Sequence, residues 1–145
     1  MQELLNYTDL DFDDLAGLMK ELSGGIALTR ESLERMLADG DSHLYVAREE
    51  GRIVACASLC IFHQPFSADA TVESVVVSSR MRGRGLGRQM MAHLLDEAMR
   101  MGVDCIHLTS KPERIAANAL YRSLGFERKE TNCYALKLNR TLDND

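Results

Sequence analysis

Apolar side chains recur early in this chain with the period of an α-helix. They are spaced three or four positions apart in residues 9–23, and residues 29–40 repeat the pattern, which predicts two amphipathic helices. Short polar side chains stand where helix N-caps are expected, with Asp11 or Asp13 in the first segment and Thr29 in the second. Each helix therefore has one apolar face to bury.

The pattern then changes to that of extended strands. Residues 43–48 and 52–62 are apolar runs joined by "EEGR", which predicts a hairpin. A third strand, "ATVESVVV" at 70–77, leads directly into a segment rich in glycine and arginine. Three consecutive strands are therefore expected after the two helices.

The second half alternates between helices and strands. Residues 85–102 predict a long helix that ends at Gly102. Its apolar face consists of Leu86, Met90, Met91, Leu94, Leu95, Ala98 and Met99. A strand, a helix with Pro112 in its first turn and two final strands are expected over 103–110, 112–126, 127–132 and 133–139. The order ααβββαβαββ predicts an α/β domain with a mixed sheet.

Composition indicates one ordinary globular domain. The 145 residues are 46% hydrophobic and 27% charged, and a chain of this length can bury a core. No apolar run approaches the ~20 residues that cross a bilayer, and the N-terminus lacks the basic region of a secretory signal. The four cysteines have no CxxC spacing and the four histidines are scattered. We therefore expect buried free thiols, no metal site and a cytoplasmic location.

Charge is unevenly distributed along the chain. Residues 1–74 carry 14 acidic and 5 basic side chains, a net −9, whereas residues 75–145 carry 8 acidic and 12 basic ones, a net +4. One half could face a cationic ligand and the other an anionic one, or the charges could simply solvate the surface. The overall acidity, with no aromatics among the arginines, argues against a nucleic-acid partner.

The most informative segment is "RMRGRGLGR" at 80–88, which has four arginines, three glycines and no acid. Glycine lets the backbone approach a ligand, and guanidinium groups suit phosphate oxygens. Between a strand and a helix, such a loop presents free N–H groups to an anion such as a pyrophosphate. Neither the P-loop pattern GxxxxGK nor the dinucleotide pattern GxGxxG fits. The spacing that fits is R-x-x-G-x-G, beginning at Arg82.

This spacing, preceded by "VVVSSRM" and followed by "LTSKPERIAANALYRSLGF" at 108–126, resembles the acetyl-CoA-dependent N-acetyltransferases of the GNAT family. The predicted order of elements is similar as well. The resemblance is specific over residues 72–126 and topological over 1–71. It implies a single acetyltransferase domain over 1–145, with a mixed, mostly antiparallel central sheet flanked by helices and an acetyl-CoA-binding core over 72–126.

The resemblance implies that backbone N–H groups from Arg82 to Arg88 hold the CoA pyrophosphate, assisted by the guanidinium groups of Arg82, Arg84 and Arg88. The alternative is that these arginines only solvate a turn. The pantetheine arm is implied to pair with residues 72–77 like an added strand and to reach Asn118. The implied cofactor residues are Val75, Val76, Val77, Arg82, Gly83, Arg84, Gly85, Leu86, Gly87, Arg88 and Asn118.

Acetyl transfer to an amine needs a base, donors for the oxyanion and an acid for the departing thiolate. By the resemblance, Glu73 takes the amine proton through water, and the N–H of Val75 or Val76 binds the oxyanion. Partial burial would raise the pKa of such a carboxyl; the alternative is a Glu73 that faces solvent. Tyr121 matches the tyrosine that protonates the CoA sulfur in the family, or else it only packs its helix.

The acceptor implied by the family is a primary amine of a small molecule or peptide, reached by direct transfer in a ternary complex. The acidic first half favours a cationic amine over a sugar phosphate. The alternative function is a non-catalytic acyl-CoA-binding regulatory module, which would dispense with Glu73 and Tyr121. Family analogy also suggests a homodimer. Neither nucleic acid nor a membrane is an expected partner.

Overall fold

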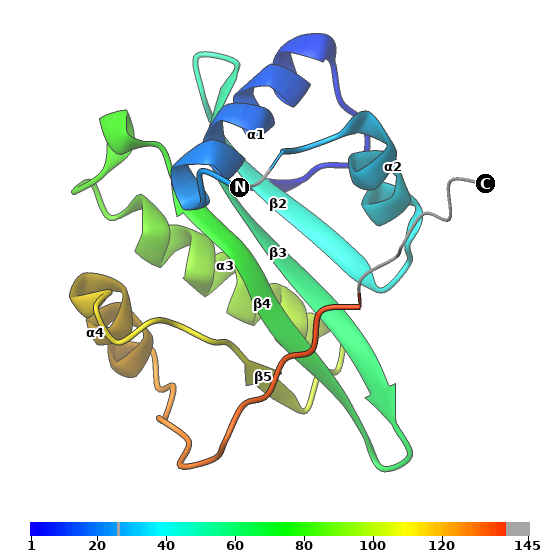
Figure 1. The fold of residues 1–145 in the computed structure, drawn as a ribbon, viewed down its shortest axis with the longest axis vertical. Helices are drawn as coiled ribbons and strands as arrows, with labels where there is room; N and C mark the ends of the chain where they lie inside the picture. Colours follow the sequence, from blue (N-terminus) through cyan, green and yellow to red (C-terminus); the bar gives the residue numbers. More distant parts are fainter. Residues whose placement is uncertain (26, 139–145) are drawn as a thin grey trace.

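One five-stranded sheet with helices on both faces forms the protein, as a computed structural model of residues 1–25 and 27–138 shows (Figure 1). The elements are β1 (Gln2–Glu3), α1 (Asp9–Leu22), α2 (Arg30–Ala38), β2 (Ser42–Glu49), β3 (Arg52–Gln64), β4 (Ser67–Val77), the short 3-10 helix η1 (Ser79–Met81), α3 (Leu86–Arg100), β5 (Cys105–His107) and α4 (Ile115–Ser123). None of the described helices is long and apolar enough to cross a bilayer.

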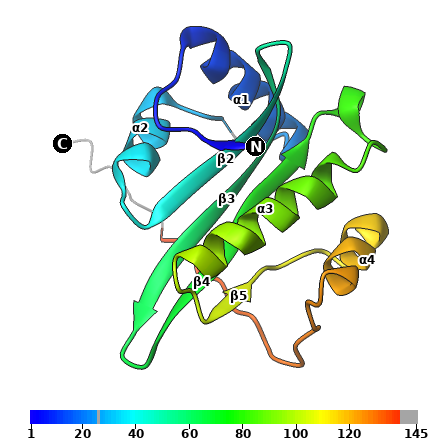
Figure 2. The same cartoon turned by 180° about the vertical axis from the view of Figure 1, so that it is seen from behind.

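The strands lie in the order β1-β2-β3-β4-β5. Neighbours from β1 to β4 pair antiparallel, whereas β4 and β5 pair parallel, so the sheet is mixed and mostly antiparallel. Helices α1 and α2 cover one face and α3 covers the other (Figures 1 and 2). The predicted fold class is confirmed, although the two-residue strand β1 was not expected.

The helix caps show which polar side chain performs which task. Thr8, not Asp11 or Asp13, caps α1, because its hydroxyl accepts the N–H of Asp11 while the Asp11 carboxylate accepts the N–H of Thr8. In this reciprocal capping box the aspartate serves as the third helical residue. The prediction for α2 is confirmed, since Thr29 accepts the N–H of Ser32.

Helix α3 packs on its side of the sheet through apolar contacts. Met90, Met91 and Leu94 are fully buried against β2, β3 and β4, which confirms most of the predicted stripe. Met99 is 77% exposed and does not belong to it. The buried side chains of α3 thus form the core of this face.

Helix α1 is fixed to the opposite face by ion pairs as well as apolar contacts. The Asp11 carboxylate accepts from Arg48 at 2.7 and 3.0 Å, and the Asp14 carboxylate accepts from Arg52 at 3.0 and 2.5 Å. These guanidinium groups lower the pKa of both aspartates. Part of the acidic charge of the first half therefore serves folding.

The last predicted elements require correction. Helix α4 begins at Ile115 rather than at Pro112, because residues 111–114 form a turn closed by the Arg114 N–H on the Lys111 carbonyl at 3.0 Å. The two final strands are absent over 127–138, and Asn139 lies outside the described residues. The alternating apolar side chains of that segment are 83–87% exposed, so no sheet packs against them: Tyr134, Leu136 and Leu138.

The prediction for the cysteines is also only partly right. All four are free thiols, as expected. Only Cys56 is buried, however, while Cys105 and Cys133 are exposed. Burial raises the pKa of the Cys56 thiol to about 12, which makes it inert.

Candidate active site

Strand β4 contains a β-bulge just before the glycine–arginine loop. Glu73 pairs with Ser58 and Val76 pairs with Cys56, so Ser74 and Val75 together face one residue of β3. Ser74 has a φ of 53°, a left-handed conformation that is unusual for serine. Such a bulge bends the strand and redirects its backbone N–H and carbonyl groups.

Strands β4 and β5 separate beyond the bulge. Their parallel pairing extends only from Asp69 and Cys105 to Thr71 and His107. Among the described residues, no strand pairs with the backbone of Val75–Val77 on this side. These residues line a cavity together with residues 109–111. The sheet is therefore open where the resemblance places the donor.

The glycine–arginine loop forms the next wall of this cavity. Gly83 and Gly85 have φ values of 79° and 75°, which glycine adopts without strain. Gly85 is the N-cap of α3, and the first bond of that helix runs from the Gln89 N–H to the Gly85 carbonyl. Within the described residues, the N–H groups of Leu86, Gly87 and Arg88 have no acceptor. These groups and the helix dipole make the wall attractive to an anion.

The cavity has a volume of about 1070 Å³ and lies between β4, the start of α3 and α4. Its lining includes most of the residues that the sequence proposed: Val75, Val76, Val77, Arg82, Gly83, Gly85, Leu86, Gly87, Arg88 and Tyr121. Because Glu21 and Tyr121 also line it, the fold assembles one site from segments up to 100 positions apart.

Tyr121 reaches the cavity from α4. Its side chain is 7% exposed and packs edge-on against Phe126, with ring centroids 6.0 Å apart. The phenol forms no hydrogen bond with any other described residue. Its hydroxyl is therefore held in place by packing and is free to bond a ligand.

Three predicted site residues do not line the cavity. Arg84 points toward Glu49, with 3.9 Å between guanidinium and carboxylate. Asn118 donates its side-chain amide to the Lys111 carbonyl at 3.0 Å, which fixes the turn before α4. Glu73 is exposed and precedes the bulge. The partial burial expected of its carboxylate is absent.

Glu73 nevertheless lies beside the opening of the sheet. Its carbonyl accepts from the Ser58 hydroxyl at 2.9 Å, which fixes the backbone at the bulge. Burial raises the pKa of the nearby Cys60 thiol, and the charge of Glu73 acts in the same direction. Glu73 thus places an exposed carboxylate directly before the bulge at Ser74 and Val75.

The cavity also contains polar groups that the sequence did not single out. The Ser110 hydroxyl is buried and has no partner in the described part of the chain. Glu21, at the end of α1, accepts from the Ser79 hydroxyl at 2.8 Å and from the Ser79 N–H. Arg88, which the sequence did predict, donates to the Ser123 hydroxyl at 2.7 Å and so joins α3 to α4. Only the tertiary fold brings these groups to one place.

Comparison with known proteins identifies a family. The profile of the acetyltransferase (GNAT) family matches residues 11–126. The chain is 35% identical over 97 residues to the N-alpha-acetyltransferase RimI of Mycobacterium tuberculosis, a match that covers 67% of this chain and 60% of RimI. The chain thus spans less than two thirds of that relative.

A second relative and a solved structure agree with this result. The chain is 30% identical over 123 residues to glucosamine 6-phosphate N-acetyltransferase 1 of Oryza sativa, covering 78% of this chain and 73% of the relative. A structure from Agrobacterium tumefaciens described as an acetyltransferase superposes with a TM-score of 0.79 at 28% identity, over 88% of this chain and 94% of that one.

Proposed function

The chain belongs to the GNAT family of acetyltransferases, and from this premise we propose that it transfers an acetyl group from acetyl-CoA to a primary amine. The observation that carries the proposal is the single cavity that joins an anion-binding helix N-terminus, an open strand edge and the Tyr121 phenol. These three features match the three parts of an acyl-CoA: the pyrophosphate, the amide-rich pantetheine arm and the thioester.

The residues present fit this donor. Pyrophosphate suits the unbonded N–H groups that follow Gly85 and the guanidinium of Arg82. The backbone of Val75–Val77 offers the unpaired edge that the pantetheine amides need. The partnerless Ser110 hydroxyl supplies a further bonding group, and the volume of about 1070 Å³ suffices for a ligand larger than most drugs.

We assign the cofactor contacts as the resemblance implies them, with two adjustments. Arg84 contacts the donor only if it leaves Glu49, and Asn118 only if it releases the Lys111 carbonyl. The remaining proposed residues line the cavity. Nine of the eleven proposed cofactor residues line the cavity, as Tyr121 does, and this lining supports the proposal.

Tyr121 is proposed as the acid. A phenol with a pKa of ~10 is protonated at neutral pH and can give its proton to a thiolate whose conjugate pKa is ~8.5. Its packed ring and unbonded hydroxyl keep the proton donor in position. The N–H of Val75 or Val76, beside the bulge, is proposed to stabilise the oxyanion.

Glu73 is proposed as the base that acts through water. An alkylammonium with a pKa of ~10 must lose a proton before it can attack. The exposed Glu73 carboxylate precedes the opening by two positions and can accept that proton from a bridging water. Its exposure also gives an incoming cation direct access to negative charge.

The first acceptor class to test is the α-amino group of a peptide. RimI, with which the chain is 35% identical, is named as an N-alpha-acetyltransferase. Glucosamine 6-phosphate is the second class, because it appears in the name of the rice relative. A peptide is favoured because the exposed Glu73 carboxylate, beside the opening, would repel the phosphate of a sugar phosphate.

One observation favours a second function, the non-catalytic acyl-CoA-binding module. Glu73 does not line the cavity, so the chain could bind the donor without having a base near it. An acetyltransferase would lose turnover, but not acetyl-CoA affinity, when Glu73 or Tyr121 is substituted. A binding module would show no turnover to lose.

The deciding experiment incubates the purified protein with acetyl-CoA and panels of peptide and small-molecule amines, and measures released CoA thiol and acetylated product. We expect turnover with at least one amine, a decrease of about 100-fold or more in kcat for Tyr121→Phe, and unchanged acetyl-CoA affinity by calorimetry. Tyr134→Phe, an exposed tyrosine elsewhere, is the matched control. Acetyl-CoA binding without turnover on any amine would establish the binding module instead.

A further inference from the structure

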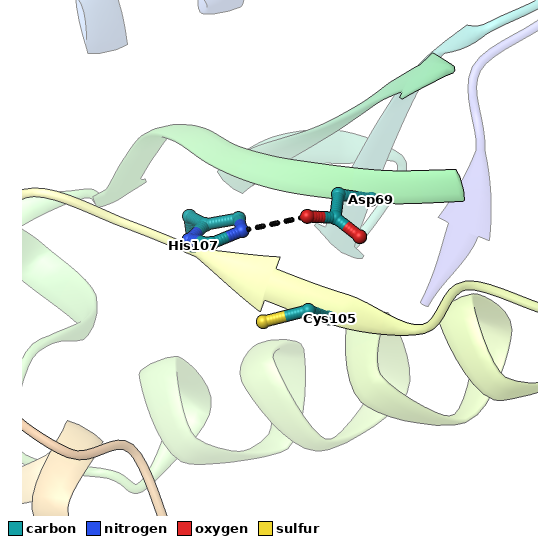
Figure 3. Close-up of side chains that lie close together, drawn as sticks. All are labelled: Asp69, Cys105 and His107. Carbon is teal, nitrogen blue, oxygen red and sulfur yellow. Dashed lines mark hydrogen bonds and ion pairs between the residues drawn. The ribbon is translucent and has the colours of Figure 1, made fainter. Parts of the chain in front are cut away.

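A second group of reactive side chains lies at the far end of β4 from the cavity (Figure 3). Asp69 on β4 is the register partner of Cys105 on β5, and His107 follows Cys105 by two positions. Residues directly opposite each other, and residues two apart on one strand, point to the same face of a sheet. The three side chains therefore lie close together, and Figure 3 shows Asp69 and His107 facing each other with Cys105 beside them on β5.

The ligand atoms are already close together. The His107 Nε2 lies 3.1 Å from Asp69 Oδ2, and the carboxylate oxygen, imidazole nitrogen and thiol sulfur all lie within 4.8 Å of one another. Around a tetrahedral zinc ion, the N–O separation is about 3.3 Å and separations to sulfur are about 3.5 Å, given metal–ligand bonds of ~2.0–2.3 Å. The imidazole and carboxylate thus have the required spacing, and a rotation of the Cys105 side chain brings the sulfur nearer.

We propose that Asp69, Cys105 and His107 form a binding site for Zn²⁺. Thiolate, imidazole and carboxylate together suit zinc, whereas Mg²⁺ and Ca²⁺ prefer oxygen ligands only. The site has three protein ligands, and the 42% exposure of the His107 side chain leaves solvent access for a water as the fourth. No ion is needed to hold the side chains together, because the sheet does so.

Supporting contacts of the kind found around zinc ligands are present. Gln64 donates its side-chain amide to Asp69 Oδ2 at 3.3 Å, and Asp69 itself is only 8% exposed. Such contacts orient a ligating carboxylate and typically change metal affinity 10–100-fold when removed. Phe62 covers one side of His107, with ring centroids 6.2 Å apart.

The zinc site is separate from the acetyl-CoA cavity and acts on it through β5. None of its three residues lines the cavity, and Asp69 precedes Val75 by six positions, about 20 Å of extended strand. Zinc would fasten β5, which has only three paired residues, to β4. Because residues 109–111 follow β5 and line the cavity, the ion would stabilise one cavity wall without taking part in acetyl transfer.

The test is a titration of the reduced, metal-free full chain with Co²⁺, followed by displacement with Zn²⁺. We expect one cobalt ion per chain, with the visible spectrum of a tetrahedral site and a thiolate charge-transfer band in the near ultraviolet. Zinc should remove both signals. Saturating zinc should raise the melting temperature by about 5–10 °C at a hundredfold excess over its Kd.

Variants identify the ligands. Cys105→Ser should abolish the charge-transfer band and weaken zinc binding more than about 100-fold, and His107→Gln and Asp69→Asn should weaken it similarly, while Gln64→Ala should weaken it about tenfold. Cys133→Ser is the matched control, since Cys133 is also an exposed free thiol. Melting curves without metal establish that each variant folds.

Two results would overturn the proposal. One is the absence of stoichiometric cobalt or zinc binding by the folded wild-type chain. The other is binding that survives Cys105→Ser or is lost in Cys133→Ser, because the metal would then occupy some other group of ligands.

Discussion

The two halves of β4 have opposite environments within one strand. The first half, Ser67–Val72, lies between β3 and β5 and includes the buried Ala70 and Val72. The second half, Val75–Val77, pairs with β3 alone and turns its other edge to the cavity. The bulge at Ser74 separates them. A sheet can therefore combine a rigid region with a binding edge when one strand bends and its neighbour ends early.

The comparison predicts that substitutions in the closed half affect stability and substitutions in the open half affect binding. Leu59 lies on β3, pairs with Val72 of the closed half and is fully buried, and its substitution should show the largest effect on stability. Leu59→Ala should lower the free energy of unfolding by about 3 kcal/mol in urea titrations, because it leaves a cavity in the core. Acetyl-CoA affinity below the transition should change less than about twofold. A loss of acetyl-CoA binding free energy as large as the loss of unfolding free energy would show that the two halves of β4 are not independent.

The glycine–arginine loop beside the open half could be predicted from the sequence better than the bend within β4. Gly83 and Gly85 could be identified because their left-handed conformations need glycine, and the spacing from Arg82 to Gly87 reports one loop. The bulge at Ser74 has no such signal, because serine does not favour a positive φ. The neighbours of Glu73 suggested burial that the bent strand does not provide.

The pairing of β4 with β5 could not be predicted from local sequence patterns. Cys105 and His107 looked scattered because Asp69, their neighbour in space, is 36 positions from Cys105, and parallel pairing is decided by packing of the crossover helix. The final strands were predicted over 127–132 and 133–139. Tyr134, Leu136 and Leu138 alternate as in a strand, yet alternation does not supply a partner strand. The domain bounds and the roles of the site residues stay predictions.

A second prediction concerns α1, whose last residues Glu21 and Leu22 line the cavity beside the open half. Asp14→Asn should cost about 2 kcal/mol of unfolding free energy at pH 7, because the carboxylate accepts bonds from Arg52 and from the Ile53 N–H. The folded-state pKa of Asp14 is lowered from 3.8, so this stability is present above pH 3.8 and is lost as the pH falls through the folded pKa.

Urea titrations of the wild type and of Asp14→Asn, from pH 7 downward, measure this pH-dependent contribution to the unfolding free energy. The difference between wild type and Asp14→Asn should shrink toward zero below the folded pKa of Asp14. A difference that stays constant with pH would mean that shape, not charge, makes the contribution. Asp13→Asn, at a neighbouring exposed position of α1, is the control and should change little.

The smallest effect is expected at Gly87, which lines the cavity beside the open half from the start of α3. A methyl group there would meet only the side chains of Leu120 and Val77 at 3.9 Å, so Gly87→Ala should fold normally. The methyl group would also stand on the wall proposed to bind the pyrophosphate, and we expect acetyl-CoA affinity to fall about tenfold in calorimetry, about 1.4 kcal/mol. Gly17→Ala, on the exposed face of α1, should leave affinity unchanged. Unaltered binding by Gly87→Ala would place the donor elsewhere.

The parallel pairing of β4 with β5 also sets an order of events during protein synthesis. A parallel partner cannot join through a tight turn, so the chain must complete α3 and cross the sheet before Cys105 can reach Asp69. Residues 109–121, which close the cavity, emerge from the ribosome later still. A nascent chain can therefore form the β2–β3–β4 meander early, but it gains the cavity proposed for acetyl-CoA only when translation has passed α4.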